Sequence, residues 1–148
     1  MKPFGYRATL FLLLGLIGTS VAMTVLNDDT AAAADAKANR VFEMRTYITH
    51  DGRLDALNAR FRNHTNKLFA KHGIDLVGYW VPVKEPESKN TLVYILGYPS
   101  LEARDASWKA FLADADWKIA KAESEKDGPI VKQVIAQYLN PTDYSPIK

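Results

Sequence analysis

Apolar and polar residues alternate along the segment Val41–Thr49, VFEMRTYIT, and several of these residues are β-branched or aromatic. This pattern predicts a β-strand that ends at a turn over residues 50–52. After the turn the apolar positions recur every three and four residues, which is the period of a helix, and Gly73 is a typical C-terminal cap. The predicted buried stripe of this helix consists of Leu54, Leu57, Phe61, His64 and Leu68.

The rest of the chain continues this succession of strands and helices. Strands are predicted over residues 74–83 and 91–99, joined by a polar turn so that they pair as a hairpin. Helices are predicted from the N-cap residue Ser100 to about residue 114, and over residues 116–126. A last strand spans residues 129–140. The order βαββαβ indicates a ferredoxin-like α+β fold with both helical segments on one face of an antiparallel sheet.

Both faces of the predicted sheet carry apolar side chains. In the third strand Leu92, Tyr94, Leu96 and Tyr98 occupy one alternation phase, while the other phase also holds valine and isoleucine. The helices cover one face only, so the simplest cover for the second face is the same face of another subunit, packed by two-fold symmetry. We therefore expect a homodimer. In the first strand, the residues expected to face the helices are Phe42, Met44 and Ile48.

The N-terminus has the composition of a targeting segment. Lys2 and Arg7 precede an apolar run, and an alanine-rich stretch follows at residues 31–34. These features predict a signal peptide over residues 1–34, a flexible lead over residues 35–40 and a folded domain over residues 41–148. The product would be periplasmic or secreted. The alternative is an uncleaved inner-membrane anchor, because residues 8–25 are about as long as a spanning helix requires.

Composition excludes several classes of function. The net charge is +2, and basic residues are interleaved with acidic ones rather than clustered, so we expect no nucleic-acid partner. The chain has no cysteine, which rules out disulfides, thiol nucleophiles and thiolate metal sites. The histidines do not have the spacing of a helical zinc site, and no glycine-rich nucleotide motif is present. We predict no metal and no cofactor.

The chain resembles the NIPSNAP family over residues 41–146. The resemblance is carried by EMRTYI, DGRLDALNARFRNHTNKLFAKHGIDLVGYW, LVYILGYPSLEARDASW, ADADW and YLNPTDYSP. It implies a dimeric α+β barrel. It implies less about function, because eukaryotic members are associated with mitochondria, vesicular traffic and protein interactions and bacterial members are mostly uncharacterised. Related barrels include cofactor-independent monooxygenases, haem-handling enzymes and small lyases, although a shared fold does not transfer an activity.

Four residues are candidates for a ligand pocket: His64, Arg45, Tyr47 and Trp80. A lone histidine on an apolar stripe is more often a hydrogen-bonded core residue than a site, yet an imidazole titrates near neutral pH and would suit a cavity between helix and sheet. Arg45 is expected to pair with an acidic residue, Glu43 or another, and its alternative role is to bind an anion beside the Tyr47 hydroxyl. Trp80 is expected in the core or an interface.

Two functions remain open from the sequence. The first is a binding or interaction module without catalysis, with a protein or a small apolar molecule as its partner. The second is a cofactor-independent enzyme, of monooxygenase or lyase type, that acts on a small apolar or aromatic molecule. In it His64 would be the base or a hydrogen-bond donor, and Arg45 and Tyr47 would position oxygen atoms.

Overall fold

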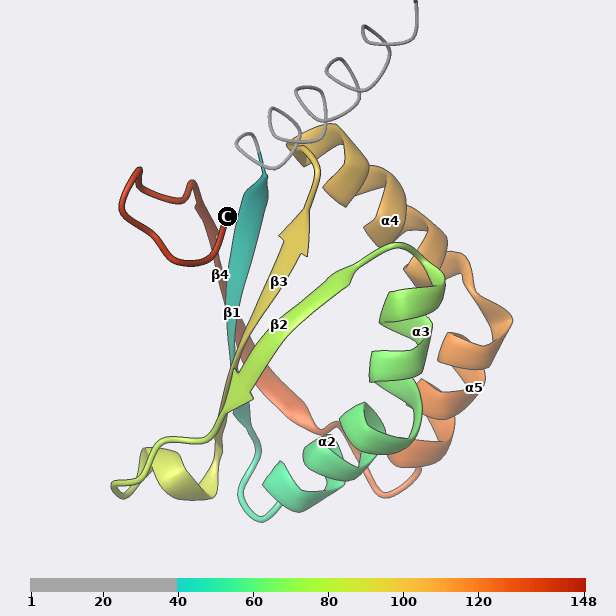
Figure 1. The fold of residues 1–148 in the computed structure, drawn as a ribbon. Helices are drawn as coiled ribbons and strands as arrows, with labels where there is room; N and C mark the ends of the chain where they lie inside the picture. Colours follow the sequence, from blue (N-terminus) through green and yellow to red (C-terminus); the bar gives the residue numbers. More distant parts are fainter. Residues whose placement is uncertain (1–39) are drawn as a thin grey trace, which may run out of the picture.

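The computed structural model describes residues 40–148, which form a four-stranded antiparallel sheet with helices on one face (Figure 1). The strands are β1 (Val41–Thr49), β2 (Asp75–Trp80), β3 (Thr91–Tyr98) and β4 (Val131–Leu139), in the order β2-β3-β1-β4. The predicted ferredoxin-like α+β fold is confirmed. Strand β2 ends earlier than predicted, because Pro82 has no N–H to donate to a ladder. The predicted signal peptide, residues 1–34, lies outside the described residues, as does the lead up to residue 39.

The first helical segment is not a regular helix. It consists of α2 (Leu54–Arg60), a π-helical turn (Phe61–Thr65) and α3 (Asn66–Lys71), and it ends at Gly73 with φ +71°, as predicted. Inside the π turn the Thr65 hydroxyl donates to the carbonyl of Arg60 at 3.3 Å.

The π turn corrects the predicted position of His64. A π turn holds more residues than an α turn, so the residues after Phe61 are rotated relative to a regular helix. Thr65 and Phe69 consequently face the sheet and are buried, whereas His64 is exposed. The regular period assumed from the sequence therefore placed the wrong side chain in the core.

The second helical segment comprises α4 (Leu101–Ala113) and α5 (Ala115–Ser124). Ser100 caps α4 as predicted, because its hydroxyl accepts from the amide of Ala103 at 3.2 Å. Asp114 caps α5 and also accepts from the side chains of Lys71, at 2.8 Å, and His72, at 2.7 Å. These hydrogen bonds hold the pKa of Asp114 well below its usual range and tie α3 to the joint between α4 and α5.

The core lies between the helices and one face of the sheet. Strand β3 supplies Leu92, Tyr94, Leu96 and Tyr98 to this face, all of them buried. Because Arg45 pairs with Tyr94 in the ladder, the same phase of β1 faces the helices. The expectation that Phe42, Met44 and Ile48 face the helices is therefore wrong, and that phase lies on the outer face. Both phases of β1 contain bulky residues, so alternation within the strand could not decide between them.

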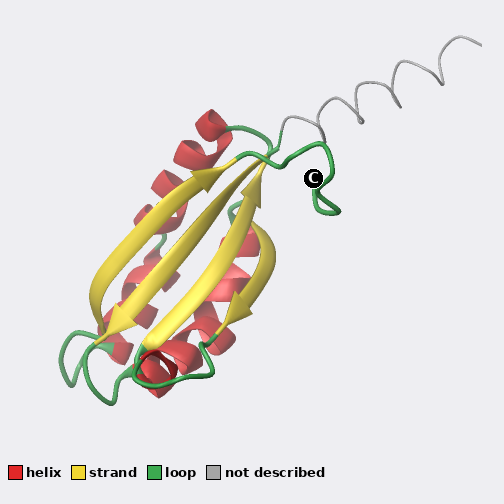
Figure 2. Ribbon diagram, turned by 90° about the vertical axis from the view of Figure 1, so that its left-hand side faces the viewer, coloured by secondary structure: helices red, strands yellow, loops and turns green. Residues whose placement is uncertain are grey.

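The outer face of the sheet is not covered by helices, as Figure 2 shows. Its central strands present half-buried side chains, among them Met44, Val93 and Ile95. Strand β4 is exposed on both faces: Ile135 on the outer face is 44% exposed and Val134 on the helix side is 46% exposed. Within residues 40–148, none of the helices is long and apolar enough to cross a membrane.

Candidate functional site

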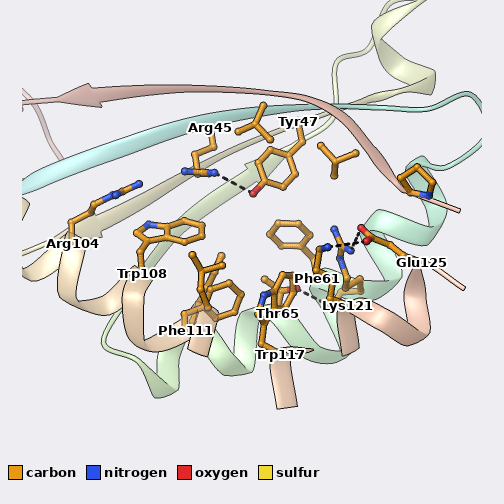
Figure 3. Close-up of a pocket in the computed structure, with 16 residues that line it drawn as sticks. Arg45, Tyr47, Phe61, Thr65, Arg104, Trp108, Phe111, Trp117, Lys121 and Glu125 are labelled. Atoms are coloured by element: carbon orange, nitrogen blue, oxygen red, sulfur yellow. Dashed lines mark hydrogen bonds and ion pairs between the residues drawn. The ribbon is translucent and has the colours of Figure 1, made fainter. Parts of the chain in front are cut away.

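A cavity of about 530 Å³ opens between the helix side of the sheet and the helices (Figure 3). Strand β1 contributes Arg45 and Tyr47, and the π turn contributes Phe61 and Thr65. The remaining wall comes from the end of α2, from α3, α4 and α5, from the connection after α5 and from the start of β4. Arg45 and Tyr47 project from the sheet toward the aromatic side chains of the helices (Figure 3). The cavity thus combines an aromatic wall with a few convergent polar groups, which is the composition of a small-molecule site.

Arg45 is held in place from three sides. Its Nε donates to the hydroxyl of Tyr94 at 3.0 Å, one terminal nitrogen donates to the hydroxyl of Tyr47 at 3.3 Å, and the other donates to Glu43. The guanidinium carbon lies 4.4 Å from the ring centre of Trp108. Burial disfavours the cation, but the neighbouring phenol oxygens and Glu43 more than offset this effect and raise the pKa of Arg45 above its ordinary value.

Glu43 is the buried acceptor of this network and has no exposed surface. Besides Arg45, its carboxylate accepts two hydrogen bonds of 2.9 Å from Arg104, one of 3.0 Å from the indole of Trp108 and one of 3.4 Å from the hydroxyl of Tyr98. Burial alone would raise the pKa of Glu43. The hydrogen bonds from Arg104 and the charge of Arg45 outweigh burial, so this pKa lies below its ordinary value. The predicted pairing of Glu43 with Arg45 is confirmed.

A second ion cluster lies where the π turn meets α5. Arg60 donates to Glu125 at 2.9 Å, and Lys121 approaches the same carboxylate at 3.1 Å. The guanidinium of Arg60 lies 5.4 Å from the ring centre of Trp117. Its Nε is buried without a hydrogen-bond partner among the described residues. Burial opposes ionisation of Glu125, but Arg60 and Lys121 lower its pKa below the ordinary value.

The aromatic wall between the two ion clusters is continuous. The ring centres of Phe69 and Phe111 are 4.8 Å apart, those of Phe69 and Trp108 are 5.5 Å apart, and those of Phe111 and Trp117 are 4.5 Å apart. Such edge-to-face and tilted contacts hold each ring in one orientation. The wall is therefore a rigid surface for an apolar or aromatic molecule.

The lining of the cavity suits binding better than proton transfer. A general base must be unprotonated and have a pKa near the working pH. None of the residues that line the cavity is a histidine, and the carboxylate among them, Glu125, is ion-paired. No group of three potential metal ligands occurs in the part of the chain that the structure describes.

The structure brings together two of the four predicted pocket residues. Arg45 and Tyr47 line the cavity. His64 lines a different groove, on the outer side of the helices, whose walls carry no aromatic side chain other than the imidazole. Trp80 is 51% exposed on β2 and does not line the cavity. Its ring lies over Gly78, where an added Cβ would approach it to 2.6 Å.

Sequence reasoning missed the contribution of the second helical segment. Arg104 and Trp108 stand one helical turn apart on α4, and both donate to Glu43. A polar side chain that faces the helices from a strand needs hydrogen-bond donors or acceptors on those helices. The polar residues Glu43, Arg45 and Tyr47 on one face of the first strand therefore indicated that a helix would supply such groups. They did not reveal which helix would supply them.

Comparisons with known proteins point to one family. The family model described as NIPSNAP matches residues 42–146. A NIPSNAP-like domain protein from Burkholderia xenovorans has a TM-score of 0.65 at 21% identity, with 74% of this chain and 90% of that chain covered. A NIPSNAP family protein with unknown function from Agrobacterium tumefaciens has a TM-score of 0.64 at 22% identity, with coverages of 75% and 96%. At these identities the likeness shows the fold alone. The comparison with curated proteins gives no match.

Proposed function

Since the chain belongs to the NIPSNAP family, whose model matches residues 42–146, we propose that it is an exported, homodimeric binding domain that holds a small apolar or aromatic molecule without transforming it. The observation that carries this proposal is the cavity between the helices and the sheet, with its aromatic wall and its ion-paired polar groups. The alternative of a cofactor-independent enzyme needs a general base. His64, the base that the sequence offered, lies on the outer side of the helices.

A substitution that fills part of the cavity tests the proposal. Leu112 lines the cavity and is 53% exposed, so the change Leu112→Trp adds an indole at its rim with little effect on the core. We expect the affinity for 2-naphthamide, a neutral aromatic probe, to fall about tenfold or more, because the indole occupies space that the probe needs. Isothermal titration calorimetry measures the affinity in each protein.

The matched control is Ile119→Trp. Ile119 is a similarly exposed apolar residue of α5, and it lines the outer groove instead of the cavity. The affinity of the Ile119→Trp variant for the probe should stay within about twofold of that of the wild type. An equal loss of affinity for the probe in both variants, or no binding of the probe by the wild type, would contradict the proposed function. Conversion of the probe into a product would favour the enzyme alternative.

The homodimer is proposed to form through the outer face of the sheet. That face carries half-buried apolar side chains in its central strands, and Ile135 on β4 extends the apolar surface to the edge. A contiguous apolar surface of this kind is unusual on a monomer. Two-fold packing would bury it while leaving the cavity on the opposite side of the sheet.

Export is proposed from the leader, residues 1–34. A signal peptide predicts that protein recovered from the cell envelope or the medium lacks this segment. Cell fractionation followed by N-terminal sequencing tests the prediction, and we expect a mature N-terminus near residue 35. Full-length protein in the membrane fraction would instead support the anchor, and full-length protein in the cytoplasm would contradict both.

A further inference from the structure

We infer that the molecule bound in the cavity is an aromatic carboxylate whose charged group is held by the guanidinium of Arg45. The inference rests on the proposed small-molecule binding function and specifies its ligand.

The charge of the lining favours an anion. Four cationic side chains line the cavity, Arg45, Arg60, Arg104 and Lys121, against the single carboxylate of Glu125. Glu43 neutralises part of this charge from behind the wall, but one buried carboxylate serves both Arg45 and Arg104. Arg104 also contacts Asp105, which is largely exposed, so solvent screens that pair. The positive charge at Arg45 is therefore incompletely balanced within the protein.

Arg45 also has the geometry to bind a carboxylate. A guanidinium carries five N–H groups, and the structure uses three of them, toward Glu43, Tyr47 and Tyr94. The other two have no acceptor among the described residues. The hydrogen bonds to the two tyrosines and the stacking on Trp108 fix the plane of the guanidinium, so a planar carboxylate would lose little entropy in meeting it.

The two ends of the cavity differ in what an anion would meet. At the end formed by Arg60 and Lys121, the carboxylate of Glu125 itself lines the cavity and would repel an anion. At the Arg45 end, Glu43 lies behind the arginines and does not line the cavity. The carboxylate of a ligand therefore belongs at Arg45. Its aromatic body then lies against the part of the aromatic wall formed by Trp108, Phe111 and Trp117, which line the same cavity.

The experiment compares two probes of the same shape, 2-naphthoate and 2-naphthamide, with protein purified from cells that express the full chain. Isothermal titration calorimetry at neutral pH and low salt gives both affinities. We expect the wild type to bind the carboxylate at least about tenfold more tightly than the amide, since a charged hydrogen-bonded pair adds to the common aromatic contact. In Arg45→Gln this preference should disappear, while the affinity for the amide changes by less than about threefold.

The control is Lys118→Gln, which removes one positive charge from an exposed position of α5 that does not line the cavity. It should keep the preference for the carboxylate. Arg45→Lys, which retains the charge, provides a second variant if Arg45→Gln does not fold, and it should keep part of the preference.

Equal affinities of the wild type for both probes would overturn the inference and leave the proposed function standing. Failure of the wild type to bind either probe would overturn both. Equal loss of both probes in a folded Arg45→Gln would assign Arg45 a structural role and overturn the inference.

Discussion

Replacement of Glu43 by glutamine is expected to lower the free energy of unfolding by about 3 to 5 kcal/mol. The carboxylate is fully buried and accepts from Arg45, Arg104, Trp108 and Tyr98. The amide of glutamine has nearly the same shape, but it carries no charge and directs N–H groups at the two guanidiniums. Both arginines would then remain buried without a negative charge beside them. Leaving a buried charge unpaired accounts for most of the cost of breaking a buried ion pair. Chemical denaturation followed by circular dichroism measures the loss.

The matched control is Glu125→Gln. Glu125 also pairs with two cations, Arg60 and Lys121, but it is 20% exposed and Lys121 is half exposed. Arg60 is itself buried, but water can reach Glu125 and Lys121 and replace part of the lost interaction, so we expect a smaller cost than at Glu43, about 1 to 2 kcal/mol. A cost at Glu43 no larger than that at Glu125 would contradict the view that the buried network holds β1 against α4.

The pH dependence of stability gives the Glu43 prediction a second readout. The pKa of Glu43 is lower in the folded protein than its ordinary value of 4.5, because Arg104 and Arg45 outweigh burial. A depressed folded-state pKa contributes stability that is complete above the unfolded-state pKa and is lost as the pH falls through the folded-state value. Glu43→Gln is therefore expected to lose less stability than the wild type between about pH 6 and pH 3. If the free energy of unfolding fell equally with pH in the wild type and in Glu43→Gln, the result would contradict the assignment of this pH dependence to Glu43.

Introduction of a charge at Ile135 is expected to convert a dimer into a monomer. Ile135 lies on the outer face of β4, opposite Thr46 in the ladder, and is 44% exposed. In a two-fold interface each substitution occurs twice, so Ile135→Glu would bury two unpaired carboxylates. The cost of burying an unpaired charge is several kcal/mol, which corresponds to a hundredfold or greater rise in the dissociation constant. Sedimentation velocity at micromolar concentration measures the change.

Val134→Glu is the matched control, because the adjacent residue has nearly the same exposure, 46%, but points to the helix side. It should leave the dimer intact. Loss of the dimer in both variants would place the interface around the edge of β4 rather than on the outer face. A monodisperse wild-type monomer at micromolar concentration would contradict the proposed homodimer altogether.

The cavity and the proposed dimer interface lie on opposite faces of one sheet. Alternate residues of β1 serve the two roles: Arg45 and Tyr47 line the cavity, while Met44 lies on the outer face. A change on one face can therefore alter ligand binding without altering the oligomeric state, and the reverse. This separation allows each prediction to be tested without interference from the other.

The sequence by itself determined the order of the elements and most of their limits. The alternation of Val41–Thr49 matches β1 residue for residue, and Gly73 ends the first helical segment as its position indicates. The pairing of Glu43 with Arg45 was also accessible, because residues two apart in a strand share a face. These features depend on neighbours in the chain, and the local sequence contains the information that defines them.

Only the tertiary structure decided which face of β1 meets the helices and which helical residue enters the core. The first choice depends on the register with β3, whose Tyr94 lies opposite Arg45, and on the donors of α4, which are 61 and 65 residues away from Glu43. The second depends on the π turn, which exposes His64 and buries Thr65. An apolar pattern indicates which residues of a segment share a face. Which face is buried depends on the elements that pack against the segment, and these come from distant parts of the chain.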